Sequence, residues 1–400
     1  MKNLILCLLV SAVCFVNMTT VLQGQKKWIT AYYPLWAVPS LYPENLEYNK
    51  LTHIVHFSAN PVRTSPYLDV LIPAEKNGFN QDSINIQWGG VYNGNNPPLW
   101  RTIDIQKTLL SKSHEAGVKV ILSVGGIYGA GAETMSWISK DSEKIKTFVA
   151  ASCAYAKRKG YDGIELDWEF PRESDRQGFN MMIRQFRNQL DSWKPRGIFI
   201  AAVFESPGPS FAYERDAMIA CFDQINPMTY EMYAGDFSSL KTGYNSPMKL
   251  STEFEGYNGY AIDQNGHGPK AWIQDGYPSE KIGLSISLLT TEFYTVTPPL
   301  QPGQSFKSKN WGYYKNVPQS GRHWDSSASV PWQASSTTFI TYEDTASVRL
   351  KGEYARSLNL GGIMIYDLLG GYVPEAAVEN RHLLLRSAEK SFTFPAAVQK

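Results

Sequence analysis

The chain has 400 residues, of which 43% are hydrophobic and 19% charged, so it can bury a full core and is not predominantly disordered. Lys and Arg number 38 against 37 Asp and Glu, and the resulting net charge of +1 gives no electrostatic reason to expect nucleic acid as a partner. The length alone allows two or three domains, or one large α/β barrel.

The N-terminus has the pattern of a secretory signal. Lys2 precedes an almost unbroken apolar run from Leu4 to Val16, which is too short to span a bilayer comfortably. We therefore expect residues 1–25 to be a signal peptide and the protein to be secreted, either outside the cell or into a periplasm. No other stretch is long and apolar enough to predict a membrane span.

The cysteines and histidines that follow the expected signal peptide show no metal-ligand pattern. Cys153 and Cys221 could form one disulfide in an exported protein, but each lies in apolar sequence, so two separate buried thiols fit the pattern at least as well. His53 and His56 lie three apart on a probable strand and point to opposite faces. We expect no metal and no organic cofactor.

Short β-branched segments alternate with longer helical patterns along the chain, which predicts an α/β fold with a parallel sheet. The expected strands are Trp28–Pro34, Thr52–Ser58, Lys119–Val124, Gly163–Glu169, Gly197–Phe204, Gln224–Tyr230, Lys281–Ser287 and Gly361–Tyr366. The clearest expected helices are Ile103–Ala116, Ser142–Lys159, Asp175–Ser192 and Ala346–Leu358. Eight such units favour a closed (β/α)8 TIM barrel over the alternative, a doubly wound open sheet, because no glycine-rich nucleotide-binding loop is present.

Two connections are unusually long and rich in aromatic residues. Pro61–Leu99 follows the second expected strand, and Leu288–Tyr342 follows the seventh. Loops that follow the strands of such a barrel lie on its catalytic face, so we expect these two to wall a substrate cleft, although they could simply cover the barrel end. We expect residues 26–400 to form a single catalytic barrel domain.

The most informative stretch runs from Asp162 to Pro171. On a strand with period two, Glu165, Asp167 and Glu169 share one face, and the residues between them are apolar. Inside a barrel, three carboxyl groups cannot all be ionised, so they share protons and their pKa values are pushed apart. Such a cluster supplies a protonated general acid near neutral pH.

This acidic stretch resembles the signature of glycoside hydrolase family 18, the chitinases and their relatives, written Asp-x-x-Asp-x-Asp-x-Glu. It matches at Asp162, Asp167 and Glu169, and has Glu165 where the family usually has Asp. Four further segments resemble family motifs in order and spacing: Ser123–Gly126, Asn226–Tyr230, Thr242–Pro247 and Gly361–Met364. The resemblance spans about Trp28 to Tyr372.

The resemblance implies a retaining hydrolase in which the acetamide of the substrate is the nucleophile. Glu169 would be the general acid and base, Asp167 would orient the acetamide N–H, and Tyr230 would donate to the acetamide oxygen. The predicted partner is chitin, or another oligosaccharide that contains N-acetylglucosamine. The residues expected to support the reaction or to bind substrate are Glu165, Asp162, Met228, Glu231, Tyr366 and Tyr33.

Several positions depart from the family pattern and leave the substrate open. Glu231 stands where Asp commonly follows Tyr230, and Tyr366 stands where the eighth strand usually has Trp. We therefore keep two alternatives to a chitinase: an endo-β-N-acetylglucosaminidase that acts on glycoprotein glycans, and a noncatalytic chitin-binding lectin on the same barrel.

Overall fold

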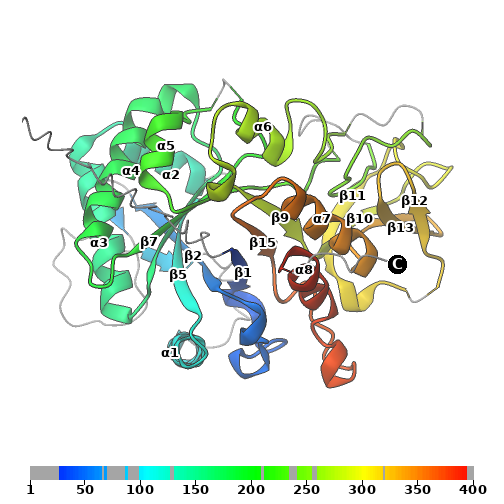
Figure 1. Cartoon of the computed structure of the whole chain (residues 1–400), viewed down its shortest axis with the longest axis horizontal. Helices are drawn as coiled ribbons and strands as arrows, with labels where there is room; N and C mark the ends of the chain where they lie inside the picture. The colour runs from blue at the N-terminus through cyan, green and yellow to red at the C-terminus, as the bar shows by residue number, and fades with distance from the viewer. Residues whose placement is uncertain are drawn as a thin grey trace, which may run out of the picture.

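The computed structural model describes residues 27–64, 67–69, 86–88, 99–126, 130–208, 211–233, 241–254, 259–318 and 320–393. Eight parallel strands form the central sheet in the order β8-β7-β6-β5-β2-β1-β15-β9 (Figure 1). A parallel bridge between Ile225 on β8 and Ile282 beside β9 brings the two ends of this sheet together. The barrel prediction is thus confirmed. The strands are β1 (Trp28–Pro34), β2 (His53–Thr64), β5 (Lys119–Gly126), β6 (Gly163–Trp168), β7 (Ile198–Val203), β8 (Gln224–Pro227), β9 (Gly283–Ser287) and β15 (Gly362–Tyr366).

Helices connect the strands and cover the outside of the barrel. The helix α3 shows how the sequence sets their ends: the Asp141 side chain accepts from the backbone N–H groups of Glu143 and Lys144, and Gly160 ends the helix in the left-handed region at φ +90°. The α-helices are α1 (Leu99–Glu115), α2 (Ala130–Ser139), α3 (Ser142–Lys159), α4 (Arg176–Asp191), α5 (Arg215–Cys221), α6 (Gly268–Gln274), α7 (Thr345–Ser357) and α8 (Leu383–Thr393). Short 3-10 turns are η1 (Leu35–Ala37), η2 (Pro43–Asn45), η3 (Tyr48–Lys50), η4 (Glu173–Asp175), η5 (Ser279–Lys281), η6 (Tyr314–Asn316) and η7 (Val378–Asn380).

The long connection after the seventh barrel strand is itself folded. It forms an antiparallel five-stranded sheet in the order β11-β10-β14-β13-β12, which lies beside the barrel next to β9 and α7 (Figure 1). Its core includes Phe293, Val330 and Phe339, which pack with Tyr233 and Tyr244 from the segment after β8. We call this unit the inserted sheet. Its strands are β10 (Leu289–Tyr294), β11 (Ser308–Tyr313), β12 (His323–Asp325), β13 (Val330–Ser335) and β14 (Thr338–Thr341).

The connection after β2 contains the other two described strands, β3 (Tyr67–Asp69) and β4 (Ile86–Trp88), and both pair antiparallel with the extended end of β2. The rest of this connection, residues 65–66, 70–85 and 89–98, lies outside the described residues. The expectation that it walls a cleft therefore stays a prediction.

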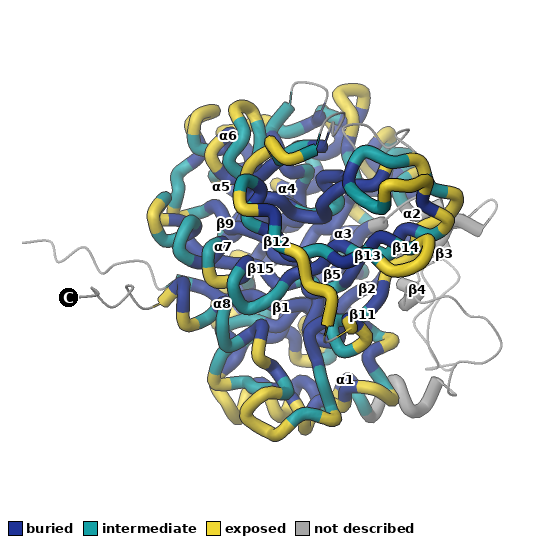
Figure 2. The backbone as a smooth tube through the Cα atoms, turned by 90° about the vertical axis from the view of Figure 1, so that its right-hand side faces the viewer, coloured by how far each residue is buried: buried dark blue, intermediate teal, exposed yellow. Residues whose placement is uncertain are grey.

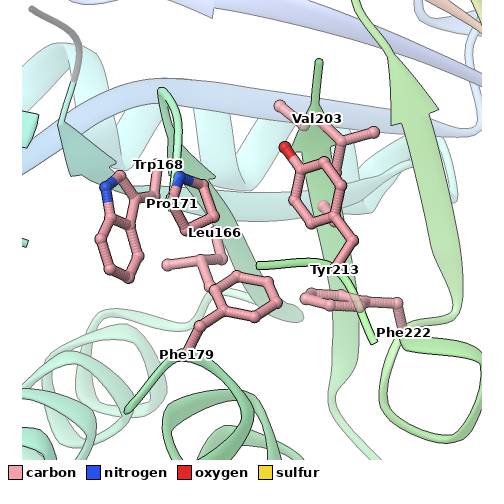
Figure 3. A pocket seen from close by; sticks show the side chains of 9 residues that line it. Leu166, Trp168, Pro171, Phe179, Val203, Tyr213 and Phe222 are labelled. Carbon is pink, nitrogen blue, oxygen red and sulfur yellow. The ribbon is translucent and has the colours of Figure 1, made fainter. Parts of the chain in front are cut away.

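The barrel strands are mostly buried (Figure 2). Their alternating side chains contribute to two separate cores, one inside the barrel and one between the sheet and the helices. On β6 the outward residues Ile164, Leu166 and Trp168 join the large core between sheet and helices. Figure 3 shows Leu166 and Trp168 lining a small apolar cavity there, together with Phe179 of α4. This cavity lies on the opposite side of β6 from its acidic residues and has no catalytic group in its lining.

The predicted signal peptide, residues 1–25, lies outside the described residues, as do Cys7 and Cys14. Cys153 and Cys221 are both free and buried, so the structure supports two separate thiols rather than a disulfide. None of the helices in the described ranges combines the length and the apolar character needed to cross a membrane.

Candidate active site

The acidic residues of β6 lie inside the barrel. Glu165 is fully buried, and Asp167 is 4% exposed. Both share the barrel interior with side chains from other strands, such as Tyr32 of β1 and Met364 of β15. Glu169 comes directly after β6 ends and is half-buried. The three carboxyl groups thus follow one another from the barrel interior toward its C-terminal end, where barrel enzymes place their chemistry.

Glu165 holds a proton more tightly than an ordinary glutamate. Burial raises its pKa to about 8, and the negative charge of Asp167 adds to this effect. The hydrogen bond from Tyr32 acts in the opposite direction and lowers the pKa. The Tyr32 hydroxyl donates to Oε1 of Glu165, whereas Oε2 is buried without a hydrogen-bond partner. Because Oε1 already accepts a hydrogen bond, the proton of the neutral Glu165 carboxyl group is expected on Oε2.

Asp167 and Glu169 are perturbed in the same direction. Burial raises the pKa of Asp167 to about 7. Burial also raises the pKa of Glu169 well above its usual value, and the negative charges of Asp167, Glu231 and Glu165 raise it further. Near neutral pH the cluster cannot lose all its protons, and Glu169 is the member that ends nearest the barrel mouth. The arrangement provides a protonated carboxyl group beside a second acid, as general acid catalysis requires.

Gly125 is the position that allows β5 to approach β6 beside Asp167. The two residues are register partners, and a Cβ atom on Gly125 would lie 2.1 Å from the backbone oxygen of Asp167. Backbone atoms cannot move aside as a flexible side chain can. Only glycine therefore fits at this point of the family motif Ser123–Gly126.

We expect Gly125→Ala to lower the free energy of unfolding by roughly 2 kcal/mol, because the added methyl group forces the two strands apart. Urea unfolding followed by circular dichroism measures this. Gly208→Ala is the matched control, since its Cβ would meet only the Phe211 ring at an ordinary 3.7 Å. Equal stability of the two variants would contradict the packing argument.

Tyr230, Met228 and Tyr366 lie at the same end of the barrel. Met228 belongs to the inner core, and both tyrosines pack against that core. The rings of Tyr230 and Tyr366 stack with centroids 5.6 Å apart and planes inclined by 21°. Burial raises the pKa of Tyr230 well above its usual value, and the acidic groups nearby, Glu169 and Asp167 among them, add to the rise. Tyr230 is therefore a neutral hydroxyl donor next to the acids.

Glu231 is held in place by the segment 242–247. Its backbone lies in the left-handed region at φ +57°, and its N–H donates to Oδ1 of Asn245 at 2.8 Å. Ser246 donates from its hydroxyl to the carbonyl oxygen of Thr229 at 2.6 Å. This segment, which resembles a family motif in the sequence, thus fixes the loop that carries Tyr230 and Glu231.

Two residues expected to support the site lie elsewhere. Asp162 precedes β6 at the opposite end of the barrel, where its carboxylate accepts from Lys119 and His114, each at 2.8 Å. Tyr33 points outward into the core between sheet and helices, and its hydroxyl donates to the carbonyl oxygen of Leu41 at 2.8 Å. The structure therefore corrects the placement of both residues. Asp162 links β6 to its neighbours at the end of the barrel opposite the acids, and Tyr33 packs outside the barrel, between the sheet and the helices.

Sequence reasoning missed two side chains that contact the site. Tyr32, not its neighbour Tyr33, reaches Glu165. The polar Thr30, which shares its strand face with Tyr32, was the only available signal for the inward face of β1. Trp311 of the inserted sheet donates its indole N–H to Oε1 of Glu231 at 2.7 Å, and no motif marks it. Within the described ranges, no group of three His, Cys, Asp or Glu side chains could hold a metal ion.

Known proteins resemble this chain in sequence and in fold. Mouse (Mus musculus) chitotriosidase-1 is 28% identical over 312 residues, which are 71% of this chain and 66% of the mouse protein, so the chain spans just under two thirds of that relative. A group IV chitinase of Ostrinia furnacalis, crystallised with allosamidin, superposes with a TM-score of 0.75 at 20% identity, over 91% of this chain and 98% of that one. Human YKL-39, described as a pseudo-chitinase with retained chitooligosaccharide binding, gives 0.75 at 18% identity, with 91% and 99% covered. The model of the glycosyl hydrolases family 18 matches residues 28–370, and the chain therefore belongs to that family.

Proposed function

We propose that this protein is a secreted, retaining glycoside hydrolase that cleaves β-1,4-linked N-acetylglucosamine polymers such as chitin. The observation that carries the proposal is the placement of Glu169 directly after β6, where burial and the neighbouring acids Asp167 and Glu231 raise its pKa, together with Tyr230 at the same end of the barrel. Membership of the family and the chitinases among its relatives support the substrate. Secretion rests on the apolar run from Leu4 to Val16.

The reaction begins when Glu169 donates its proton to the oxygen of the glycosidic bond. The carbonyl oxygen of the substrate's own acetamide attacks the anomeric carbon as the bond breaks, and a cyclic oxazolinium ion forms. Asp167 accepts a hydrogen bond from the acetamide N–H and offsets its positive charge, while Tyr230 donates to the acetamide oxygen. Glu169, now ionised, takes a proton from water, and the water opens the ring with net retention of configuration.

The physical advantage of this scheme is that the nucleophile is already tethered to the reacting sugar. An intramolecular attack avoids the entropy cost of bringing a separate nucleophile to the anomeric carbon. It also explains why a second acid, Asp167, is needed close to Glu169. Positive charge develops on the acetamide nitrogen, and Asp167 is the group that offsets it. The scheme therefore requires a 2-acetamido group on the sugar at the nonreducing side of the cleaved bond.

A product time course on the N-acetylglucosamine tetramer, with anomers resolved by NMR, tests the proposal. We expect β-anomers to appear first, because two displacements at one carbon restore its configuration. Initial α-anomers would contradict the participation of the acetamide. A parallel incubation with an N-linked glycoprotein separates the endo-β-N-acetylglucosaminidase alternative, which would release glycans and leave the tetramer intact. Binding of the tetramer without any hydrolysis would instead indicate the lectin.

A further inference from the structure

The inserted sheet presents an exposed tryptophan toward the loop that follows Tyr230. Trp311 is 54% exposed, although it lies on β11 within a folded sheet. The strand β11 is the edge of that sheet, since it pairs only with β10 in the strand order. Trp311 lies beside Glu231, which the sequence predicts to bind substrate, and tryptophan is enriched at binding surfaces because its ring joins a large apolar face to a polar N–H group.

A side-chain and a backbone hydrogen bond fix Trp311 at its place on β11. Its Nε1 donates to Oε1 of Glu231, and its backbone N–H donates to Oδ1 of Asn310 at 3.0 Å. The next residue, Gly312, leaves room for the Glu292 side chain of β10, because a Cβ there would lie 2.3 Å from Oε1 of Glu292. The hydrogen bond to Glu231 orients the ring before any ligand arrives, which lowers the entropy cost of binding.

Lys309 lies two residues before Trp311, on the same face of β11, and reaches the same loop. Its Nζ lies 3.8 Å from Oε1 of Glu231 and 4.8 Å from the centre of the Tyr233 ring. Glu231 in turn lies within electrostatic reach of Glu169, whose proton affinity it increases. Glu231 thus contacts the Trp311 indole on one side and influences the proposed general acid, Glu169, on the other.

We infer that Trp311 is the stacking platform for a second N-acetylhexosamine ring, the neighbour of the ring that reacts, and that Glu231 orients this platform. The inference rests on the proposed function. A pyranose ring has one face of C–H groups, and an oriented indole removes that face from water while the hydroxyl groups stay solvated. Glu231 and Lys309 beside the ring offer an acceptor and a donor for those hydroxyl groups.

Calorimetric binding of the N-acetylglucosamine tetramer to the Glu169→Gln protein tests the platform without turnover. In that background we expect Trp311→Ala to weaken Kd about tenfold, as the removal of a central aromatic anchor typically does. Trp311→Phe keeps a stacking face and loses only the N–H donor, so we expect it to stay within about threefold of the parent. If Trp311 merely positioned Glu231, the phenylalanine and alanine variants would lose affinity equally, and that result would overturn the inference.

Tyr42→Ala is the matched control, because Tyr42 is an exposed aromatic residue, 42% accessible, that lies on the side of the molecule toward which Tyr33 points. We expect it to bind the tetramer as the parent does. If the Glu169→Gln parent binds no tetramer at all, the proposed substrate fails together with the platform. If the parent binds and Trp311→Ala binds equally well, only the platform is refuted and the proposed function stands.

Discussion

Replacement of Glu169 by glutamine is expected to lower kcat on N-acetylglucosamine oligomers by a factor of at least about 10³, the upper range for a general acid that must also act as base. The amide keeps the size of the side chain but has no proton of suitable acidity to give to the leaving oxygen. Binding of the oligomer should survive, because the change removes no packing contact. A reducing-end assay gives kcat, and calorimetry gives Kd.

The control for this change is Glu173→Gln, which makes the same chemical replacement four residues further on, at an exposed position of η4. It should retain the kcat and Kd of the parent. Loss of activity in both variants would show that the assay reports general damage to this segment. Full activity of Glu169→Gln would show that Glu169 is not the general acid, and the mechanism that the family resemblance implies would not apply to this protein.

The barrel could be predicted because its strands and helices carry local signals. The strand Trp28–Pro34 and the helix Ser142–Lys159 have the predicted bounds to the residue. Along β6 the alternation of acidic and apolar residues separates two faces, and the structure places those faces inside and outside the barrel. Period two on a strand and a capped helix are properties of a few neighbouring residues, so the sequence alone contains them.

The inserted sheet could not be predicted in the same way. Its strand Ser308–Tyr313 is mostly polar and exposed, and it exists because it pairs with β10 across a gap in sequence. The same limit applies to Tyr32 and Tyr33, since alternation tells that they face opposite ways but not which one faces inward. Contacts such as Trp311 to Glu231 join segments 80 residues apart and leave no trace in either segment alone.

Glu165→Gln is expected to change the pH dependence of stability. In the native protein the pKa of Glu165 is about 8, against an ordinary value of 4.5, so between these pH values the folded state binds more protons than the unfolded state. The free energy of unfolding therefore falls as pH rises through this window, by up to about 1.4 kcal/mol per pH unit for one group. Glutamine does not titrate, so the variant should lack this contribution, and its stability should rise relative to the parent by on the order of 3 kcal/mol between pH 5 and pH 8.

The comparison is clean because the amide reproduces the contacts of the protonated acid. The glutamine carbonyl can accept from the Tyr32 hydroxyl as Oε1 does, and its NH₂ group takes the place of the protonated Oε2, which is buried without a partner in either case. Urea unfolding at pH 5 and pH 8 measures the difference, and Glu173→Gln should follow the parent at both. A variant that parallels the parent across this range would mean that Glu165 is ionised in the folded protein. The proton shared among the three acids would then have to reside on Asp167 and Glu169 alone, and Glu165 would add a fixed negative charge that holds the proton on Glu169 still more tightly.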